Sequence, residues 1–394
     1  MGFAIDRISQ TLSTTRQRVA SRRAVVGGAA KLAGGGAVAL ASGAAVTRSA
    51  MAAPSRAQDA TPSADGTTPN PQMQEVLDEL AALSNIPIES QTPFNARQLP
   101  GVADAALSLL SKRGEPALAP VASVEHRLIP TPAGDLVARV YTPEGTGPFP
   151  VIVYYHGGGW VIADIRTYDS SCRALCTAAT AVVVSVAYRQ APENPFPAAV
   201  DDAFASYQYV MANAAEFGGD PARVAVAGES AGGNLAAVTC LLASAQGVPL
   251  PVHQLLVYPV TTFVPEAEGA ETVEQFAMAK PLGAGLLTFF GSLYVPNQAD
   301  KMSPNASPLL AEELGGLPPA TIIAASIDPL LGQGQQYAAA LEAAGVDVSY
   351  ALYEGVTHEF FGLGALVDDA QTAVTEAAAR LTESFSAASG TPTP

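Results

Sequence analysis

Short apolar runs recur along this chain from residue 123 onward. Each run is five to eight residues long and is bounded by Gly, Pro or polar residues. Such runs predict β-strands. The predicted strands are Ser123 to Ile129, Asp135 to Tyr141, Val151 to Tyr155, Ala181 to Ala187, Arg223 to Ala227, Val252 to Tyr258, Ala320 to Ile327 and Val348 to Tyr353.

Longer stretches with helical periodicity separate the later strands. They are Tyr168 to Thr180, Ala198 to Phe217, Ala231 to Ala245, Gln333 to Ala344 and Asp368 to Ser386. This alternation predicts an α/β fold with a mostly parallel, eight-stranded sheet and helices on both faces. Ligands of such sheets bind beyond the carboxyl ends of the strands. Two more helical patterns, Met73 to Leu83 and Val102 to Lys112, precede the first strand.

The length and composition suit one globular unit with appendages. The 394 residues, 48 % of them hydrophobic, can bury one large core. The three cysteines do not form a disulfide framework. Cys172 and Cys176 lie one turn apart on a predicted helix and Cys240 lies in an apolar one, so we expect three buried thiols.

The first 52 residues differ from the rest of the chain. They hold seven basic residues and one acidic residue, and Ser21-Arg22-Arg23 precedes a weakly apolar Ala/Gly stretch. This pattern resembles a twin-arginine export signal, with an A-x-A cleavage site at Ala50 to Ala52. We therefore expect a periplasmic or secreted protein with no stable membrane insertion after signal removal. An uncleaved anchor and an organelle transit peptide stay open as alternatives. Residues 53–70 are predicted to be a disordered linker.

Charge limits the choice of partners. Beyond residue 52 the chain has 13 basic and 35 acidic residues, a net charge of −22. A phosphate backbone would be repelled by such a surface, so we do not expect nucleic acid as a partner. Pairing of two copies in a homodimer is left open.

A glycine-flanked serine follows the predicted strand at 223–227. In Gly228-Glu229-Ser230-Ala231-Gly232, the strand is expected to break sharply into a helix. A side chain at the tip of such a turn is held clear of its neighbours in a strained conformation. Ser230 is therefore a candidate nucleophile.

A second glycine motif follows the strand at 151–155. It reads His156-Gly157-Gly158-Gly159-Trp160. Its glycines leave backbone N–H groups uncovered, which is the geometry needed to hold the negative charge that develops when a carbonyl is attacked. The alternative is a turn that only connects strand to helix.

The general base can be found by elimination among four histidines. In this type of turn the chain order is serine, acid, histidine, which excludes His126 and His156. No acid lies between Ser230 and His253, so His253 is interpreted as a packed histidine. His358 remains, in a loop-like stretch after the strand at 348–353.

Two acids compete as the partner of this histidine. Asp328 ends the predicted strand at 320–327 and is followed by proline, so its carboxylate is expected at the same sheet edge as the glycine motifs. Its other interpretation is a helix N-cap. Glu354, which also ends a predicted strand, is the second candidate.

These residues resemble the hormone-sensitive-lipase family of α/β-hydrolases, whose signatures are H-G-G-G, G-D-S-A-G-G, D-P-L and a late H-G-F. The corresponding stretches here are His156 to Gly159, Gly228 to Gly233, Asp328 to Leu330 and His358 to Phe360, and the resemblance covers about residues 120 to 385. This chain departs from the signatures at Glu229, Gln190, Glu359 and Leu331 to Gln333. No departure removes a catalytic group, but the shape of the pocket stays open.

The resemblance implies a role for each motif residue. Ser230 is the nucleophile, His358 the base and Asp328 the group that orients the imidazole, while the N–H groups of Gly158, Gly159 and Ala231 hold the oxyanion. No metal and no organic cofactor is needed. It also implies a helical cap, made here by residues 71–120 and by an insert at about 261–305 in a catalytic domain spanning 121–390. The residues that could line an acyl pocket are Phe276, Met278, Leu286, Leu287, Phe289, Phe290 and Tyr294.

The sequence thus predicts a serine carboxylic ester hydrolase that acts on small-molecule esters with short- to medium-chain acyl groups. Three alternatives remain. An amidase or polysaccharide deacetylase would use the same triad, a lipase would differ mainly in its lid and pocket, and a silent ligand-binding protein could share the fold.

Overall fold

The computed structural model describes residues 67–116, 118–264 and 271–389. The predicted export signal lies outside the described residues, as does most of the predicted linker. In the described part of the chain, no helix has the length and apolar character needed to cross a membrane.

Eight strands form a single sheet. They are β1 (Ser123–Ile129), β2 (Leu136–Thr142), β3 (Phe149–Tyr155), β4 (Val182–Val186), β5 (Gly219–Glu229), β6 (Gln254–Val257), β7 (Ala320–Ile327) and β8 (Val348–Thr357). Their order is β1-β2-β4-β3-β5-β6-β7-β8. β2 pairs antiparallel with β1 and β4, and every other neighbouring pair is parallel. The prediction of a mostly parallel eight-stranded sheet is confirmed.

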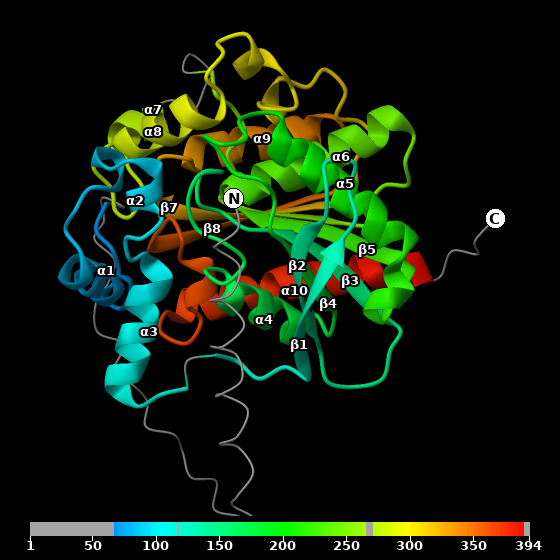
Figure 1. Cartoon of the computed structure of the whole chain (residues 1–394), viewed down its shortest axis with the longest axis horizontal. Helices are drawn as coiled ribbons and strands as arrows, with labels where there is room; N and C mark the ends of the chain where they lie inside the picture. The colour runs from blue at the N-terminus through cyan, green and yellow to red at the C-terminus, as the bar shows by residue number, and fades with distance from the viewer. Residues whose placement is uncertain (1–66, 117, 265–270, 390–394) are drawn as a thin grey trace, which may run out of the picture. The chain divides into compact units, whose positions relative to one another are not determined.

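Helices cover both faces of this sheet (Figure 1). One face packs against α5 (Ala198–Ala212), α6 (Ala231–Gln246) and α9 (Leu331–Ala343), and the other against α4 (Asp169–Ala178) and α10 (Asp368–Ser389). Both helical layers are needed because β3 is apolar on both of its faces. Val151 and Val153 belong to one apolar cluster, whereas Ile152 and Tyr154 belong to the other.

Apart from η2 (Ala214–Phe217) and η5 (Phe361–Leu363), the remaining described helices lie before β1 and between β6 and β7. The first group comprises α1 (Pro71–Leu83), η1 (Ile88–Ser90), α2 (Pro93–Ala96) and α3 (Val102–Arg113), and the second α7 (Glu271–Gln275), α8 (Ala284–Tyr294), η3 (Asp300–Met302) and η4 (Pro308–Leu310). α1 packs against α3, and α8 contacts η1. Figure 1 shows α7 and α8 beside the N-terminal helices. These segments occupy the residues for which a cap was predicted, of which 265–270 lie outside the described residues.

One predicted boundary was wrong in a way that affects the site. β8 continues past Tyr353 to Thr357, so Glu354 lies within the strand and His358 follows the strand end directly. The stretch that begins at Glu354 was predicted to be loop-like, but Gly355 takes a φ of 70° at an irregularity within the pairing with β7. Two helices are also shorter than predicted: α5 ends at Ala212, with η2 (Ala214–Phe217) following, and α4 ends at Ala178.

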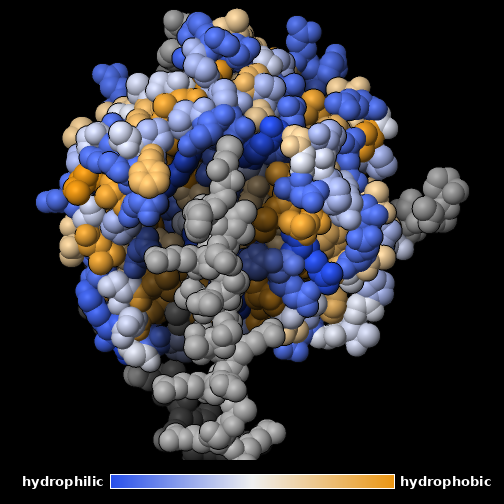
Figure 2. Space-filling view, in the orientation of Figure 1, coloured by the Kyte–Doolittle hydropathy of each residue, from blue (hydrophilic) through white to orange (hydrophobic). Residues whose placement is uncertain are grey.

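The surface mixes hydrophobic and hydrophilic residues on the face seen in Figure 2. Phe94 and Met278, in the two cap segments, are 72 % and 85 % exposed. All three cysteines are free and buried, as predicted.

Candidate active site

Three chemically active side chains meet at the carboxyl ends of β5, β7 and β8. Ser230 follows β5, Asp328 follows β7 and His358 follows β8. Ile327 and Thr357, the residues just before the acid and the histidine, are register partners in the sheet. The strand pairing therefore places the acid and the histidine side by side.

The turn at Ser230 has the strained geometry predicted for it. Ser230 has φ 56° and ψ −118°, and the next residue begins α6. A Cβ on Gly228 would overlap the carbonyl of Gly232, and a Cβ on Gly232 would overlap the carbonyl of Tyr155. Both glycines are needed because backbone packs directly on backbone here.

A chain of hydrogen bonds links the three side chains. His358 Nε2 lies 2.9 Å from Ser230 Oγ, and His358 Nδ1 lies 2.7 Å from Asp328 Oδ2. The other carboxylate oxygen of Asp328 accepts a hydrogen bond from the Leu330 N–H at 2.8 Å, which fixes the carboxylate plane. All three residues are buried. Glu354, the second candidate acid, is exposed on β8.

The local charges favour protonation of His358. Burial alone would lower the pKa of its imidazole, but the charge and hydrogen bond of Asp328 outweigh burial and raise the pKa above the ordinary value. Glu359 and Glu229 act in the same direction. The imidazole is therefore well suited to accept a proton from Ser230.

This shift predicts the acid limb of the pH profile. Only neutral His358 can accept the Ser230 proton, so kcat/KM for p-nitrophenyl butyrate should fall as pH drops through a midpoint above about 6.5. Initial rates between about pH 5 and 9 would measure this midpoint, with tryptophan fluorescence as a control for unfolding. A midpoint below the ordinary imidazole value would contradict it.

The glycine loop after β3 lies against the same site. Gly158 and Gly159 have φ values of 95° and 59°, and a Cβ on Gly159 would overlap the ring of Phe290. Among the described residues, the N–H groups of these two glycines donate to no carbonyl oxygen. Ala231 is the first residue of α6, where N–H groups have no intrahelical partner.

His156 holds this loop rather than taking part in the hydrogen-bond chain. Its ring stacks on Tyr188 with 4.3 Å between centroids, and its Nδ1 lies 2.8 Å from the Gly157 carbonyl oxygen. Burial lowers the pKa of His156 to about 4, so the ring is neutral at physiological pH. His253 is buried between Ser384 and Thr321 hydroxyls, as expected of a packed histidine.

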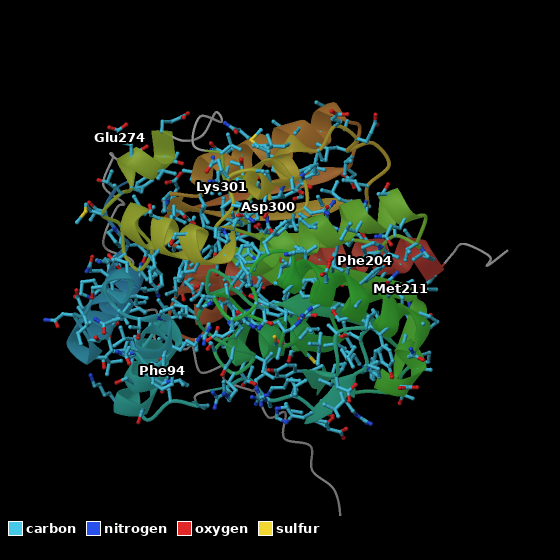
Figure 3. The ribbon with its side chains drawn as sticks, turned by 45° about the horizontal axis from the view of Figure 1, so that its top comes forward. Phe94, Phe204, Met211, Glu274, Asp300 and Lys301 are labelled. Carbon is cyan, nitrogen blue, oxygen red and sulfur yellow. The ribbon has the colours of Figure 1, made fainter. Side chains whose placement is uncertain are left out.

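A cavity of about 1660 Å³ opens beside Ser230 and His358. The glycine loop, the N-terminal segment and the insert line it, and Figure 3 shows its lining residues Glu274 and Lys301 on the insert side. Of the seven predicted pocket residues, Leu286, Leu287 and Phe290 line the cavity. The prediction was wrong for the other four: Phe276 and Tyr294 are buried away from the cavity, Phe289 packs outside its lining, and Met278 points into solvent.

A buried carboxylate lies behind the serine. The hydroxyls of Tyr154 and Tyr258 both donate hydrogen bonds to the Glu229 carboxylate. The ring of Tyr258 also packs against the imidazole of His358, with 4.4 Å between the ring centroids. Burial raises the pKa of Glu229 to about 7, against the opposing hydrogen bonds. The tyrosines come from separate strand ends and carry no local signal, so the sequence interpretation missed them.

Two other departures from the signatures also have structural roles. Gln190 donates to the carbonyl oxygens of Ile162 and Ala163, which supports the glycine loop. Gln333 accepts hydrogen bonds from the N–H groups of Thr261 and Thr262 at the start of the insert.

A mostly parallel sheet with a serine, a histidine and an acid joined at its strand ends defines a serine hydrolase of the α/β class. A family model described as the alpha/beta hydrolase fold matches residues 152–362. The chain belongs to this family, in its hormone-sensitive-lipase group.

Curated relatives and solved structures agree with this assignment. Carboxylic ester hydrolase LipN of Mycobacterium tuberculosis is 44 % identical over 241 residues, which cover 60 % of this chain and 63 % of LipN. Carboxylesterase NlhH of the same organism is 40 % identical over 278 residues, covering 69 % of this chain and 86 % of NlhH. The structure of a hyperthermophilic esterase from the archaeon Pyrobaculum calidifontis is 35 % identical, with a TM-score of 0.72, covering 80 % of this chain and 99 % of that one. The protein is a carboxylesterase-type hydrolase.

Proposed function

We propose that this protein hydrolyses carboxylic esters with short- to medium-chain acyl groups through an acyl-enzyme on Ser230. The observation that carries the proposal is the hydrogen-bond chain from Ser230 through His358 to Asp328 at the wall of an apolar cavity. The exposed position of Glu354 supports Asp328 as the acid.

In the first half of the reaction, Ser230 Oγ attacks the ester carbonyl carbon while its proton passes to His358 Nε2. The carbonyl oxygen becomes an oxyanion held by the N–H groups of Gly158, Gly159 and Ala231. The carbon–oxygen bond to the alcohol then breaks, and His358 gives its proton to the leaving oxygen. Asp328 stabilises the imidazolium that exists between these transfers.

In the second half, a water molecule attacks the acyl-enzyme. His358 takes a proton from this water, and the same N–H groups hold the second oxyanion. Collapse of the intermediate releases the carboxylic acid and returns the proton to Ser230 Oγ. The cycle uses only groups of this chain and water.

Phe290 is the side chain that we expect to limit acyl-chain length. Its ring packs on Gly159 and lines the cavity, so truncation should open space beside the oxyanion site. Phe290→Ala should raise the ratio of kcat/KM for p-nitrophenyl laurate to that for p-nitrophenyl butyrate by roughly tenfold.

The matched control is Phe289→Ala, which removes the same type of side chain at the adjacent position. Phe289 does not line the cavity. The variant should leave the laurate-to-butyrate ratio unchanged. A wild-type enzyme that prefers laurate to butyrate, or equal ratios in the two variants, would contradict the proposed acyl-chain limit.

A further inference from the structure

The residue after the histidine has an unusual backbone for its type. Glu359 has φ 71°, in the left-handed region that glycine adopts freely and that strains other side chains. Such strain persists where the surrounding structure holds it, and it is common at functional sites.

The Glu359 carboxylate is held at the cavity wall. One of its oxygens accepts a hydrogen bond from the Tyr168 hydroxyl at 2.6 Å, and both residues line the cavity together with Ser230 and His358. The Tyr168 hydroxyl in turn packs so closely on Gly157 that a Cβ there would overlap it. The carboxylate is thus fixed between the glycine loop and the histidine.

This carboxylate still has binding capacity. Within residues 67–116, 118–264 and 271–389, no ion pair includes Glu359, and its second oxygen accepts no hydrogen bond. A carboxylate has about four acceptor sites, and one hydrogen bond leaves most of them free. A donor group of a substrate could therefore bind here.

The chemistry of ester cleavage tells which part of the substrate would meet Glu359. His358 Nε2 delivers its proton to the leaving alcohol oxygen, so the alcohol must lie on the imidazole side of the reacting carbon. The carbonyl oxygen lies on the other side, toward Gly158 and Gly159. Glu359 directly follows His358 and lines the same cavity, and we infer that the alcohol, the part of the substrate on the imidazole side, is the part that reaches its carboxylate.

We propose that Glu359, positioned by Tyr168, is a specificity-determining residue that selects esters whose alcohol part carries a hydrogen-bond donor, an ammonium above all. This proposal rests on the proposed function and adds the class of alcohol to it. A charge-assisted hydrogen bond to a carboxylate is stronger than a neutral one, and an anionic alcohol would be repelled.

A second effect of Glu359 must be separated from recognition. Its charge also favours protonated His358, which would alter the hydrolysis of every ester alike. A ratio of two substrates measured on one variant cancels this common effect.

The test uses butyrate esters that differ only in their alcohol: 2-(dimethylamino)ethyl, 2-hydroxyethyl, propyl and carboxymethyl butyrate. All four give the same butyryl-enzyme, so differences in kcat/KM report the acylation step, in which the alcohol is still bound. The full chain at neutral pH should favour the aminoethyl and hydroxyethyl esters over the propyl ester, and the carboxymethyl ester should be the poorest substrate.

Glu359→Gln keeps the shape and removes the charge, so the aminoethyl-to-propyl ratio should fall by roughly tenfold, and the hydroxyethyl-to-propyl ratio by less. Tyr168→Phe should lower the aminoethyl ratio by a smaller factor, because the carboxylate loses its anchor. The matched control is Glu354→Gln, the same change on exposed β8, which should leave every ratio unchanged. If Glu359→Gln does not fold, Glu359→Gly removes the left-handed strain and should show the same loss.

An unchanged aminoethyl-to-propyl ratio in a folded, active Glu359→Gln or Glu359→Gly variant would overturn this proposal and leave the proposed function intact. The proposed function fails separately, if Ser230→Ala hydrolyses all four esters at the wild-type rate.

Discussion

Ser230→Ala should lower kcat for p-nitrophenyl butyrate by about 10⁵-fold or more, the largest effect that we expect. The variant loses the atom that forms the bond to the acyl carbon, whereas the glycine loop and the cavity stay in place. A residual rate above that in water is expected, since the oxyanion donors would still bind the substrate. Steady-state kinetics on purified protein, with thermal unfolding as a check on folding, measures the effect.

The control for this variant is Ser206→Ala. Ser206 is also a buried serine, on α5, and its hydroxyl donates to the Ala203 carbonyl oxygen away from the cavity. Its replacement should leave kcat within about twofold of wild type, because surface and remote substitutions seldom reach the reacting groups. Equal activities of Ser230→Ala and wild type would refute the assigned nucleophile.

Asp328→Asn should cause the second largest loss, on the order of 10³- to 10⁴-fold in kcat. The amide is nearly isosteric, so the packing around this fully buried side chain should survive. The uncharged amide cannot stabilise the imidazolium, and it can hold the His358 imidazole in the wrong tautomer. The acid limb of the pH profile should also move to lower pH, because the charge that raises the pKa of His358 is gone.

Glu354→Gln is the control that separates the two candidate acids. It removes a carboxylate from the neighbouring strand at an exposed position, so kcat should change little. A large loss in Glu354→Gln together with a small one in Asp328→Asn would reverse the assignment of the acid.

The sequence was sufficient for the features that are encoded locally. The strand-to-helix turn at Ser230 and the loop at Gly158 each follow an apolar run, and parallel strands bring their ends to one edge whatever the details of packing. Chain order then left His358 as the base candidate. The choice between Asp328 and Glu354 depended on where a strand ends, which is the least certain part of sequence interpretation.

The pocket could not be predicted in the same way. Phe276, Phe290 and Tyr294 are all apolar residues at helical spacing, and all three are buried, but only Phe290 lines the cavity. On α8 the buried residues Leu286, Phe290 and Tyr294 form one stripe, of which the first two line the cavity and Tyr294 does not, so periodicity does not tell which buried residues face substrate. The tyrosines around Glu229 come from β3 and from the end of β6, which flank β5 in the sheet but are far apart in the sequence, so no local sequence pattern predicts their contact with Glu229.

The register pairing of Ile327 with Thr357 has a consequence for how this protein can change over evolution. Backbone pairing of β7 with β8 places the residues that carry the carboxylate and the imidazole next to each other. A substitution in the covering helices that tilts β7 and β8 should move Asp328 and His358 together. The two residues would then shift toward or away from Ser230, which lies on the other side of β6. Substitutions in the helices around the sheet would then change mainly the distance between Ser230 Oγ and His358 Nε2. Selection could adjust this distance without changing the contact between Asp328 and His358.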